Sequence, residues 1–319
     1  MIRLDLKNAA AATILLFAAT IFVCGQDASP TPDLETILKN ADEQAQNYRL
    51  EFKNLLSEEK KTFETFDKNG DRKKRTVVES NFIIFQSLND ESVSSEYRSV
   101  VKVNDKNLGD TEKRSNDLFE QLARASSVKQ ELEKIQKESS RYDKNLQITG
   151  LTLLQTPILA DYARPFFDFK LTNRENTDGA DVFVVEYRQT KPSPYVLIDE
   201  RADESKKITI GFDLGLPKIL NKSNVFLRGK LWIDAQTFQI RREERELTGQ
   251  TDGAAGTLIL FRGEFEYQPS DFGILVPRKI TYSYFQVKSK DNNVSAKLDT
   301  RATFEYAKFR KSRVEVKID

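Results

Sequence analysis

The sequence contains no histidine, and its single cysteine, Cys24, and single methionine, Met1, both lie near the N-terminus. A chain without His and Cys beyond residue 25 cannot form an ordinary zinc site, a Cys–His pair or a Ser–His–Asp triad. It cannot form a disulfide either, so core burial alone would have to stabilise it in an oxidising compartment. Catalysis would have to use carboxylates, Lys, Tyr, Arg or a borrowed cofactor. We expect no enzyme, no cofactor and no metal site.

The N-terminal segment has the pattern of a signal peptide. Met1–Asn8 carries two basic residues, and the unbroken apolar run Ala9–Val23 follows it. The run is too short to span a bilayer comfortably but suits a signal-peptide core. We predict cleavage after Gly25, a periplasmic or secreted mature protein without a transmembrane span, and a short tether over residues 26–33. Residues 34–319 then form a single β-rich domain.

Cys24 raises the alternative of a lipid anchor, since a lipobox cysteine becomes acylated. That motif has a small residue just before the cysteine, whereas this sequence has Val23. The mismatch argues against lipidation.

The charges balance. The chain has 50 basic and 49 acidic side chains, and removal of the leader takes two of the former and one of the latter. A neutral mature chain lacks the basic footprint that general nucleic-acid binding requires. Its net charge also provides no attraction to an anionic membrane surface.

The most informative stretch is Val225–Arg242, which predicts an antiparallel hairpin. Successive strand residues point to opposite faces, which puts Trp232 opposite Leu231 and Ile233. Asp234–Thr237 supplies a turn in which the aspartate carboxylate can bond the turn's own backbone.

This hairpin carries a resemblance. The run from Gly229 to Arg242, with the preceding strand Asp178–Tyr187, resembles the LolA/LolB-like superfamily of periplasmic lipoprotein carriers. The resemblance implies a half-open barrel that is closed by helices and holds acyl chains. No position here matches the arginine that gates such carriers, so the resemblance transfers no site residue.

The N-terminal half mixes helices and strands. The apolar spacing after Pro32 predicts a helix to about Asn47, and Tyr48–Leu56 is predicted as the first strand, with a turn at Ser57–Lys61. The basic run Arg72–Arg75 beside the next turn could contact phosphate or a lipid headgroup, although a solvated hairpin tip is favoured.

Two later segments interrupt the strands. Residues 111–140 are polar with one thin apolar stripe, which predicts a helical insertion. We expect a break in this helix near Ser126–Ser127, and we expect the helix to lie across one face or the mouth of the sheet. Leu146–Ala163 is apolar and contains Pro157, so it forms either packed core, which is favoured, or a sticky flap.

Many consecutive hairpins with few helices predict an α+β fold: one large, curved antiparallel sheet, or half-open barrel, with helices packed over its concave face. Such a cover can leave an apolar pocket for a lipid or acyl chain. An ordinary core role is favoured for each candidate pocket residue, with Trp232 as the strongest candidate for a ligand contact at a rim. The candidates are Trp232, Phe82, Ile84, Phe183, Val185, Phe261, Phe265, Tyr282 and Tyr284.

Two alternatives to a lipid-binding protein stay open. The first is an envelope interaction scaffold without a ligand cavity, which docks a protein partner through an exposed apolar stripe on the 111–140 helix. The second is a carboxylate-dependent hydrolase, in which Glu243 and Asp234 flank a cleft.

Overall fold

The structure is a computed structural model, and contacts divide the chain into Met1–Pro32 and Asp33–Asp319. The predictions for the signal peptide, Cys24 and most of the tether lie outside the described residues. The described residues are 31–90, 93–143, 152, 155–198, 210–212, 216, 220–250, 257–290 and 293–311.

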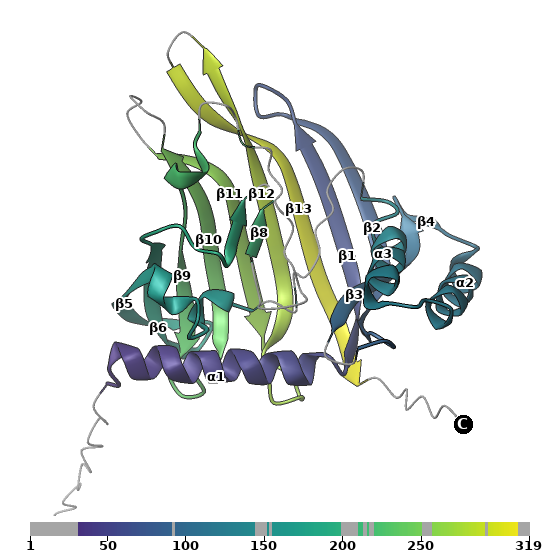
Figure 1. Cartoon of the computed structure of the whole chain (residues 1–319), viewed down its shortest axis with the longest axis horizontal. Coiled ribbons are helices and arrows are strands. Elements are labelled where there is room, and N and C mark those ends of the chain that lie inside the picture. Colours follow the sequence, from purple (N-terminus) through teal and green to yellow (C-terminus); the bar gives the residue numbers. More distant parts are fainter. Residues whose placement is uncertain are drawn as a thin grey trace, which may run out of the picture. The chain divides into compact units, whose positions relative to one another are not determined.

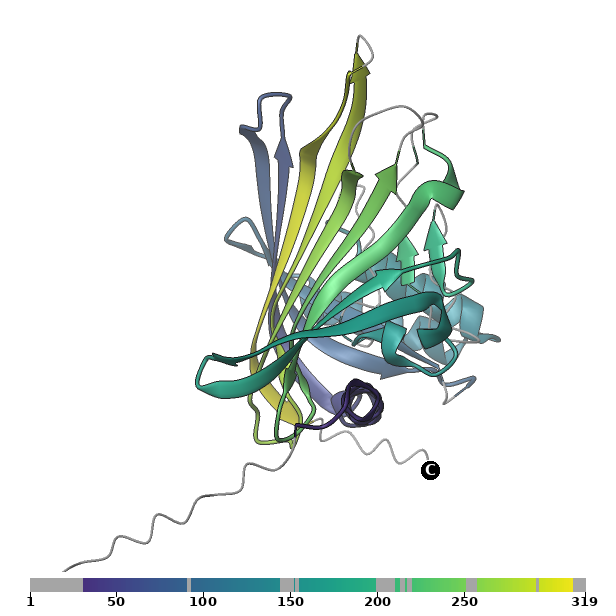
Figure 2. The same ribbon diagram turned by 90° about the vertical axis from the view of Figure 1, so that its left-hand side faces the viewer.

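An 11-stranded antiparallel sheet forms the body of the second unit, with strand order β4-β3-β2-β1-β13-β12-β11-β10-β9-β6-β5. The sheet curves strongly without closing (Figures 1 and 2), so the predicted α+β fold with a large curved sheet is confirmed. Its strands are β1 (Leu55–Phe66), β2 (Arg72–Gln86), β3 (Ser94–Val103), β4 (Lys106–Asn107), β5 (Phe167–Thr177), β6 (Ala180–Gln189), β9 (Val225–Asp234), β10 (Ile240–Gln250), β11 (Thr257–Gln268), β12 (Val276–Lys290) and β13 (Asn293–Lys311).

Short elements complete the fold. The strands β7 (Val196–Ile198) and β8 (Ile210–Phe212) form a separate parallel pair. Three 3-10 turns are η1 (Pro157–Leu159), η2 (Arg164–Phe166) and η3 (Lys222–Asn224).

The predicted hairpin β9–β10 is confirmed, including its turn. Asp234 Oδ1 accepts hydrogen bonds from the backbone N–H groups of Gln236 at 3.0 Å and Thr237 at 2.9 Å. Gly229 lies where the ring of Tyr187 crosses β9. A Cβ at this position would come within 2.5 Å of that ring and 2.0 Å of the Glu244 carbonyl oxygen, so this packing requires glycine.

Helix α1 (Leu34–Phe52) crosses one end of the sheet (Figure 1), and Asp33 caps it by accepting a hydrogen bond from the Thr36 N–H. The predicted strand Tyr48–Leu56 is wrong at its start, because the helix continues through Phe52. Tyr48 and Phe52 extend the buried helical stripe at the four-residue spacing that places side chains on one face. They stack on each other with ring centroids 5.0 Å apart.

The helical insertion is a helix pair, α2 (Thr111–Ala123) and α3 (Val128–Ser139), so the predicted break is confirmed. Ser127 begins α3 by accepting a hydrogen bond from Gln130 N. The apolar stripe of the pair, Leu118, Leu122 and Ile135, is buried against Tyr97 of β3. None of the helices in the described part of the chain is long and apolar enough to cross a membrane.

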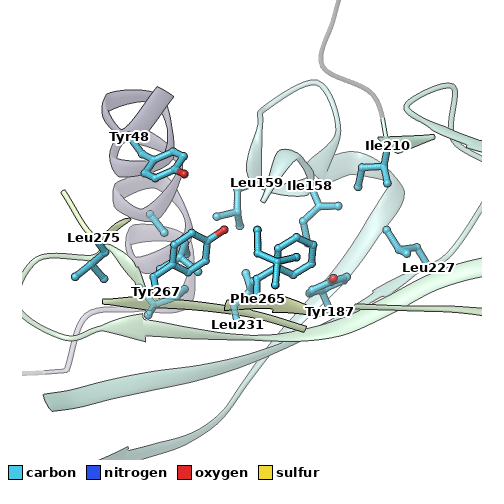
Figure 3. Packing of buried hydrophobic residues seen from close by; sticks show 14 of the residues in the cluster. Tyr48, Ile158, Leu159, Tyr187, Ile210, Leu227, Leu231, Phe265, Tyr267 and Leu275 are labelled. Carbon is cyan, nitrogen blue, oxygen red and sulfur yellow. The ribbon is translucent and has the colours of Figure 1, made fainter. Parts of the chain in front are cut away.

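The main core lies between the concave face of the sheet and its cover. Figure 3 shows Leu231, Phe265 and Tyr187 on the sheet facing Ile158 and Leu159. We call the described residues 152 and 155–159 the covering segment. Helix α1 and the strands β7 and β8 contribute further buried side chains to the same cluster.

The outer face carries charges in register. One row of paired positions crosses seven neighbouring strands from β10 to β3 with strictly alternating sign. Opposite charges directly across strands stabilise a sheet, whereas like charges destabilise it. The members of the row are Arg242, Glu266, Lys279, Glu305, Lys60, Glu79 and Lys102.

This row predicts the effect of a charge reversal. Lys279→Glu places three acidic side chains abreast on β11, β12 and β13, and we expect it to lower the free energy of unfolding by about 1–2 kcal/mol. Urea unfolding at low salt measures the loss, which added salt should reduce by screening. Lys129→Glu on the exposed side of α3 is the matched control and should change stability little. Equal losses for both variants would contradict a role for the row.

Candidate functional site

The structure places the nine candidate residues on both faces of the sheet. Trp232 is separated from the others, whereas eight candidates belong to the concave core cluster or pack against it. These eight are Phe82, Ile84, Phe183, Val185, Phe261, Phe265, Tyr282 and Tyr284.

Trp232 lies on the outer face, where it packs with Val182 and Val184. Its Nε1–H donates a hydrogen bond to Glu175 Oε1 at 2.9 Å, and the guanidinium of Arg242 lies 4.7 Å from its ring centroid. These contacts occupy both the polar group and the face of the indole ring. Trp232 therefore does not belong to the concave core cluster.

Four rings gather on the concave face at β8, β11 and β12. The ring centroid of Phe261 lies 5.1 Å from Phe212, 4.9 Å from Tyr282 and 5.2 Å from Tyr284. Phe261 and Phe212 are buried, whereas Tyr282 and Tyr284 are half-buried. We call Phe212, Phe261, Tyr282 and Tyr284 the aromatic patch. Phe212 was not a sequence candidate, because the isolated strand β8 gave no clear pattern.

The remaining candidates lie around the patch or away from it. Phe265 adjoins it, with its ring centroid 5.7 Å from that of Tyr282. Phe82 instead packs against Tyr306, and Phe183 stacks on Phe238 beside the β9–β10 turn. The sequence candidates therefore do not form one pocket.

A buried ionic network, which the sequence reasoning missed, lies on the concave face near α1. Arg98 Nε donates to both carboxylate oxygens of Glu59, at 2.8 and 3.0 Å, and its Nη2 donates to Glu96 at 2.9 Å. All three side chains are at most 4% exposed. Burial acts to lower the pKa of Arg98, but Glu59 and Glu96 outweigh it and hold that pKa well above its ordinary value.

Two neighbours extend this Arg98 network. Lys61 forms a buried ion pair with Asp143, beyond the end of α3. Burial lowers the pKa of Lys61 and raises that of Asp143. The predicted turn at Ser57–Lys61 is wrong, because these residues lie within β1 and Ser57, Glu59 and Lys61 point into the core. The sequence pattern did not indicate a strand here, because the inward positions of β1 are polar as well as the outward ones.

A second ionic cluster lies on β10. Glu243 is fully buried and accepts hydrogen bonds from Arg245 at 2.8 and 2.9 Å, from the Tyr187 hydroxyl at 3.0 Å and from the Thr156 hydroxyl at 3.2 Å. Arg245 also lies 4.8 Å from the ring centroid of Phe265. Arginine and hydrogen-bond donors therefore satisfy both oxygens of the carboxylate.

The two ionic clusters hold the same covering segment. Glu96 Oε1 accepts hydrogen bonds from the N–H and hydroxyl of Thr152, at 2.7 and 2.8 Å, and Tyr48 of α1 donates to the Thr152 carbonyl at 2.7 Å. Thr156 contacts Glu243, and Ile158 and Leu159 are fully buried. For the described residues of Leu146–Ala163, packed core rather than an exposed flap is confirmed.

The carboxylate pair considered for hydrolysis does not form one site. Glu243 points to the concave core with Leu231, whereas Asp234 is paired with Val182 on the outer face and is held by Arg241 at 2.7 Å. Within the described residues, no group of three or more Cys, Asp or Glu side chains could hold a metal ion.

A polar pocket of about 650 Å³ lies against β5, β6, β9 and β10. Its lining includes four cations and four anions, which lie in two rows of positions that pair across these four strands. Among them are the ion pairs Lys230–Glu186 and Arg228–Glu246, both at 2.8 Å. None of the nine candidates lines it. Its charged lining differs from that of an acyl-chain site, which is predominantly apolar.

Comparisons with known proteins give similar structures only. No protein-family model matches the sequence, and no curated protein matches it. One similar structure is a DUF1329 family protein from Desulfovibrio piger, with 11% identity, coverage of 91% of this chain and 96% of that one, and a TM-score of 0.31.

Two further solved structures are similar to this chain. A putative outer membrane lipoprotein-sorting protein domain from Vibrio parahaemolyticus is 9% identical, and a LolA superfamily protein from Nitrosomonas europaea is 12% identical. Each alignment covers 89% of this chain and 96% of the other, with TM-scores of 0.35 and 0.31 respectively. One of these similar structures is thus named for the superfamily that the sequence resembles.

Removing Arg98 tests the buried network. Arg98→Ala leaves Glu59 and Glu96 buried without their counter-charge, and we expect a loss of about 3–5 kcal/mol in the free energy of unfolding. The control is Arg228→Ala, which removes a half-exposed pair with Glu246 and should cost under about 1 kcal/mol. Urea unfolding measures both, and a small loss for Arg98→Ala would contradict the assigned role.

Buried tyrosines predict sensitivity to alkali. Burial raises the pKa of Tyr48, Tyr187, Tyr267 and Tyr306 in the folded chain, whereas an unfolded tyrosine titrates near pH ~10. Above that pH the folded state binds more protons than the unfolded state, so stability falls as pH rises. The slope should reach about 1.4 kcal/mol per pH unit for each buried tyrosine.

Stability measured from pH 8 to pH 11 checks this, with tyrosinate absorbance followed in parallel. Tyr187→Phe should make the alkaline slope shallower. Tyrosine ionisation that is complete before unfolding begins would contradict the prediction.

Proposed function

We propose that this chain is a non-enzymatic protein of the cell envelope that binds a lipid or acyl chain on the concave face of its sheet, at the aromatic patch. The observation that carries the proposal is the half-buried state of Tyr282 and Tyr284 on the concave face, which leaves part of each ring accessible. They leave an accessible aromatic surface beside the buried rings of Phe261 and Phe212.

The two halves of the concave face differ in the contacts that cover them. Near α1, hydrogen bonds to Glu96 and Glu243 and the buried side chains of Ile158 and Leu159 hold the cover in place. Along β11 the patch lies four to six residues from the α1 contact at Tyr267, a distance of about 13–20 Å, because Tyr282 pairs with Gly263 and Tyr284 with Phe261. There the contacts are between rings, which a ligand can replace with its own apolar contacts at little cost.

The chemistry of the patch suits an acyl chain. Burying apolar surface is worth about 25 cal/mol per Å², and methylene groups pack well on aromatic rings. The Tyr282 hydroxyl also offers a hydrogen bond to a carboxyl or ester group at one end of the ligand.

Lipid content of the purified protein tests the proposal. Protein isolated from the envelope without detergent should release a lipid or fatty acid on organic extraction, detected by mass spectrometry. The double variant Tyr282→Ser/Tyr284→Ser removes half-buried rings and should retain about tenfold less, which corresponds to a loss of about 1.4 kcal/mol.

The matched controls are Trp232→Phe on the outer face and Phe119→Ser on the exposed side of α2. Both should retain wild-type lipid content. Wild-type protein that carries no lipid and binds no added fluorescent fatty acid would refute the proposal. If such protein instead crosslinked to one envelope protein, the interaction scaffold would be the better description, although the apolar stripe of α2 and α3 is already buried inside the molecule.

A further inference from the structure

Charge is distributed unevenly between the two ends of the sheet, although the chain is nearly neutral. Residues 33–52, which form α1 and its cap, contain five acidic and two basic side chains. At the opposite end the hairpins β1–β2 and β12–β13 project beyond the other strands (Figures 1 and 2). Residues 67–75, 286–288 and 294–299 there contain seven basic and three acidic side chains. We call these three ranges the basic tips.

The two hairpins of the basic tips are held together. Lys297 Nζ donates a hydrogen bond to the carbonyl oxygen of Lys68 at 3.1 Å, which joins the β12–β13 hairpin to the β1–β2 turn. Asp67 Oδ1 accepts hydrogen bonds from the N–H groups of Asn69 and Asp71, at 2.8 and 3.0 Å. These hydrogen bonds of Asp67 fix the conformation of the turn, so the neighbouring cations lie on a well-defined loop.

Three cations of the basic tips are available to a partner. Lys73, Arg75 and Lys288 are exposed, and none forms an ion pair with another described residue. Arg72, by contrast, pairs with Glu64 at 3.0 Å. Half-buried apolar side chains lie on the same hairpins: Phe66, with Arg301 5.3 Å from its ring centroid, and Val287, one side of which packs against the main core.

We propose that the basic tips are a docking surface for an anionic phospholipid membrane. Lysine and arginine side chains near an anionic bilayer each contribute about 1 kcal/mol of attraction, and two joined hairpins present several of them at once. The acidic α1 end would be repelled, so the charge separation also orients the molecule with the tips toward the lipid. Neutral overall charge does not prevent this, because screening makes the local charges decisive within about 10 Å.

An anionic bilayer fits this surface better than a soluble acidic partner does, because apolar side chains lie beside the cations. Apolar side chains beside the cations can enter the interfacial layer while the cations stay among the headgroups. Docking does not depend on whether the aromatic patch binds a ligand, and the two can be tested separately.

Vesicle co-sedimentation of the mature chain tests the docking surface. Wild-type protein should bind vesicles of phosphatidylglycerol and phosphatidylcholine, bind pure phosphatidylcholine vesicles poorly, and dissociate from the anionic vesicles as salt is added. The triple variant Lys73→Glu/Arg75→Glu/Lys288→Glu should bind the anionic vesicles on the order of 100-fold more weakly. All three side chains are exposed, but Arg75 lies directly across from Glu64 on β1, so we expect the variant to melt a few degrees below wild type and to stay folded at the assay temperature.

The control variant Lys113→Glu/Lys129→Glu/Lys137→Glu makes the same change in net charge on exposed positions of α2 and α3. It should keep most of the binding, which would support a local surface rather than a net-charge effect. Equal losses for the two triple variants, or wild-type binding that ignores lipid charge, would overturn the proposal. Loss of vesicle binding with unchanged lipid content would leave the acyl-chain proposal intact.

Discussion

The fold depends on keeping charged groups paired inside an apolar core. Arg98 lies between Glu59 and Glu96, and Glu96 in turn holds Thr152, to which Tyr48 of α1 also bonds. Each partner left alone would be a buried charge without compensation, which costs several kcal/mol. The Arg98 network therefore connects β1, β3, α1 and the covering segment and holds them in one arrangement.

This constraint divides the concave face into two regions. Around Arg98 and Glu243, opening the cover would break charge-assisted hydrogen bonds in a low-dielectric interior, which is expensive. At the aromatic patch the contacts are between rings, and dispersion with a ligand can replace them. The proposed ligand would therefore be accommodated most easily at the patch, away from α1.

The outer face of the sheet carries paired charges. A sheet of eleven strands exposes a broad surface to water, and the alternating row from Arg242 to Lys102 makes that surface polar while each charge faces its opposite. The row contributes four basic and three acidic side chains to a chain that is 31% charged and nearly neutral. At the two ends of the sheet the charges are uneven, with an excess of acids on α1 and of cations on the basic tips.

The sequence by itself determined the curved sheet, the hairpin at Asp234 and the break in the helical insertion, because strand alternation, turn chemistry and capping act between residues close in the chain. Local rules failed where distant groups decide: Ser57–Lys61 lies in a strand because its inward charges find Arg98 and Asp143 far along the chain. Strand alternation, by contrast, correctly placed Trp232 and Leu231 on opposite faces of the sheet. Only the tertiary structure decided which of the two faces is the concave one, since that follows from what packs against the sheet.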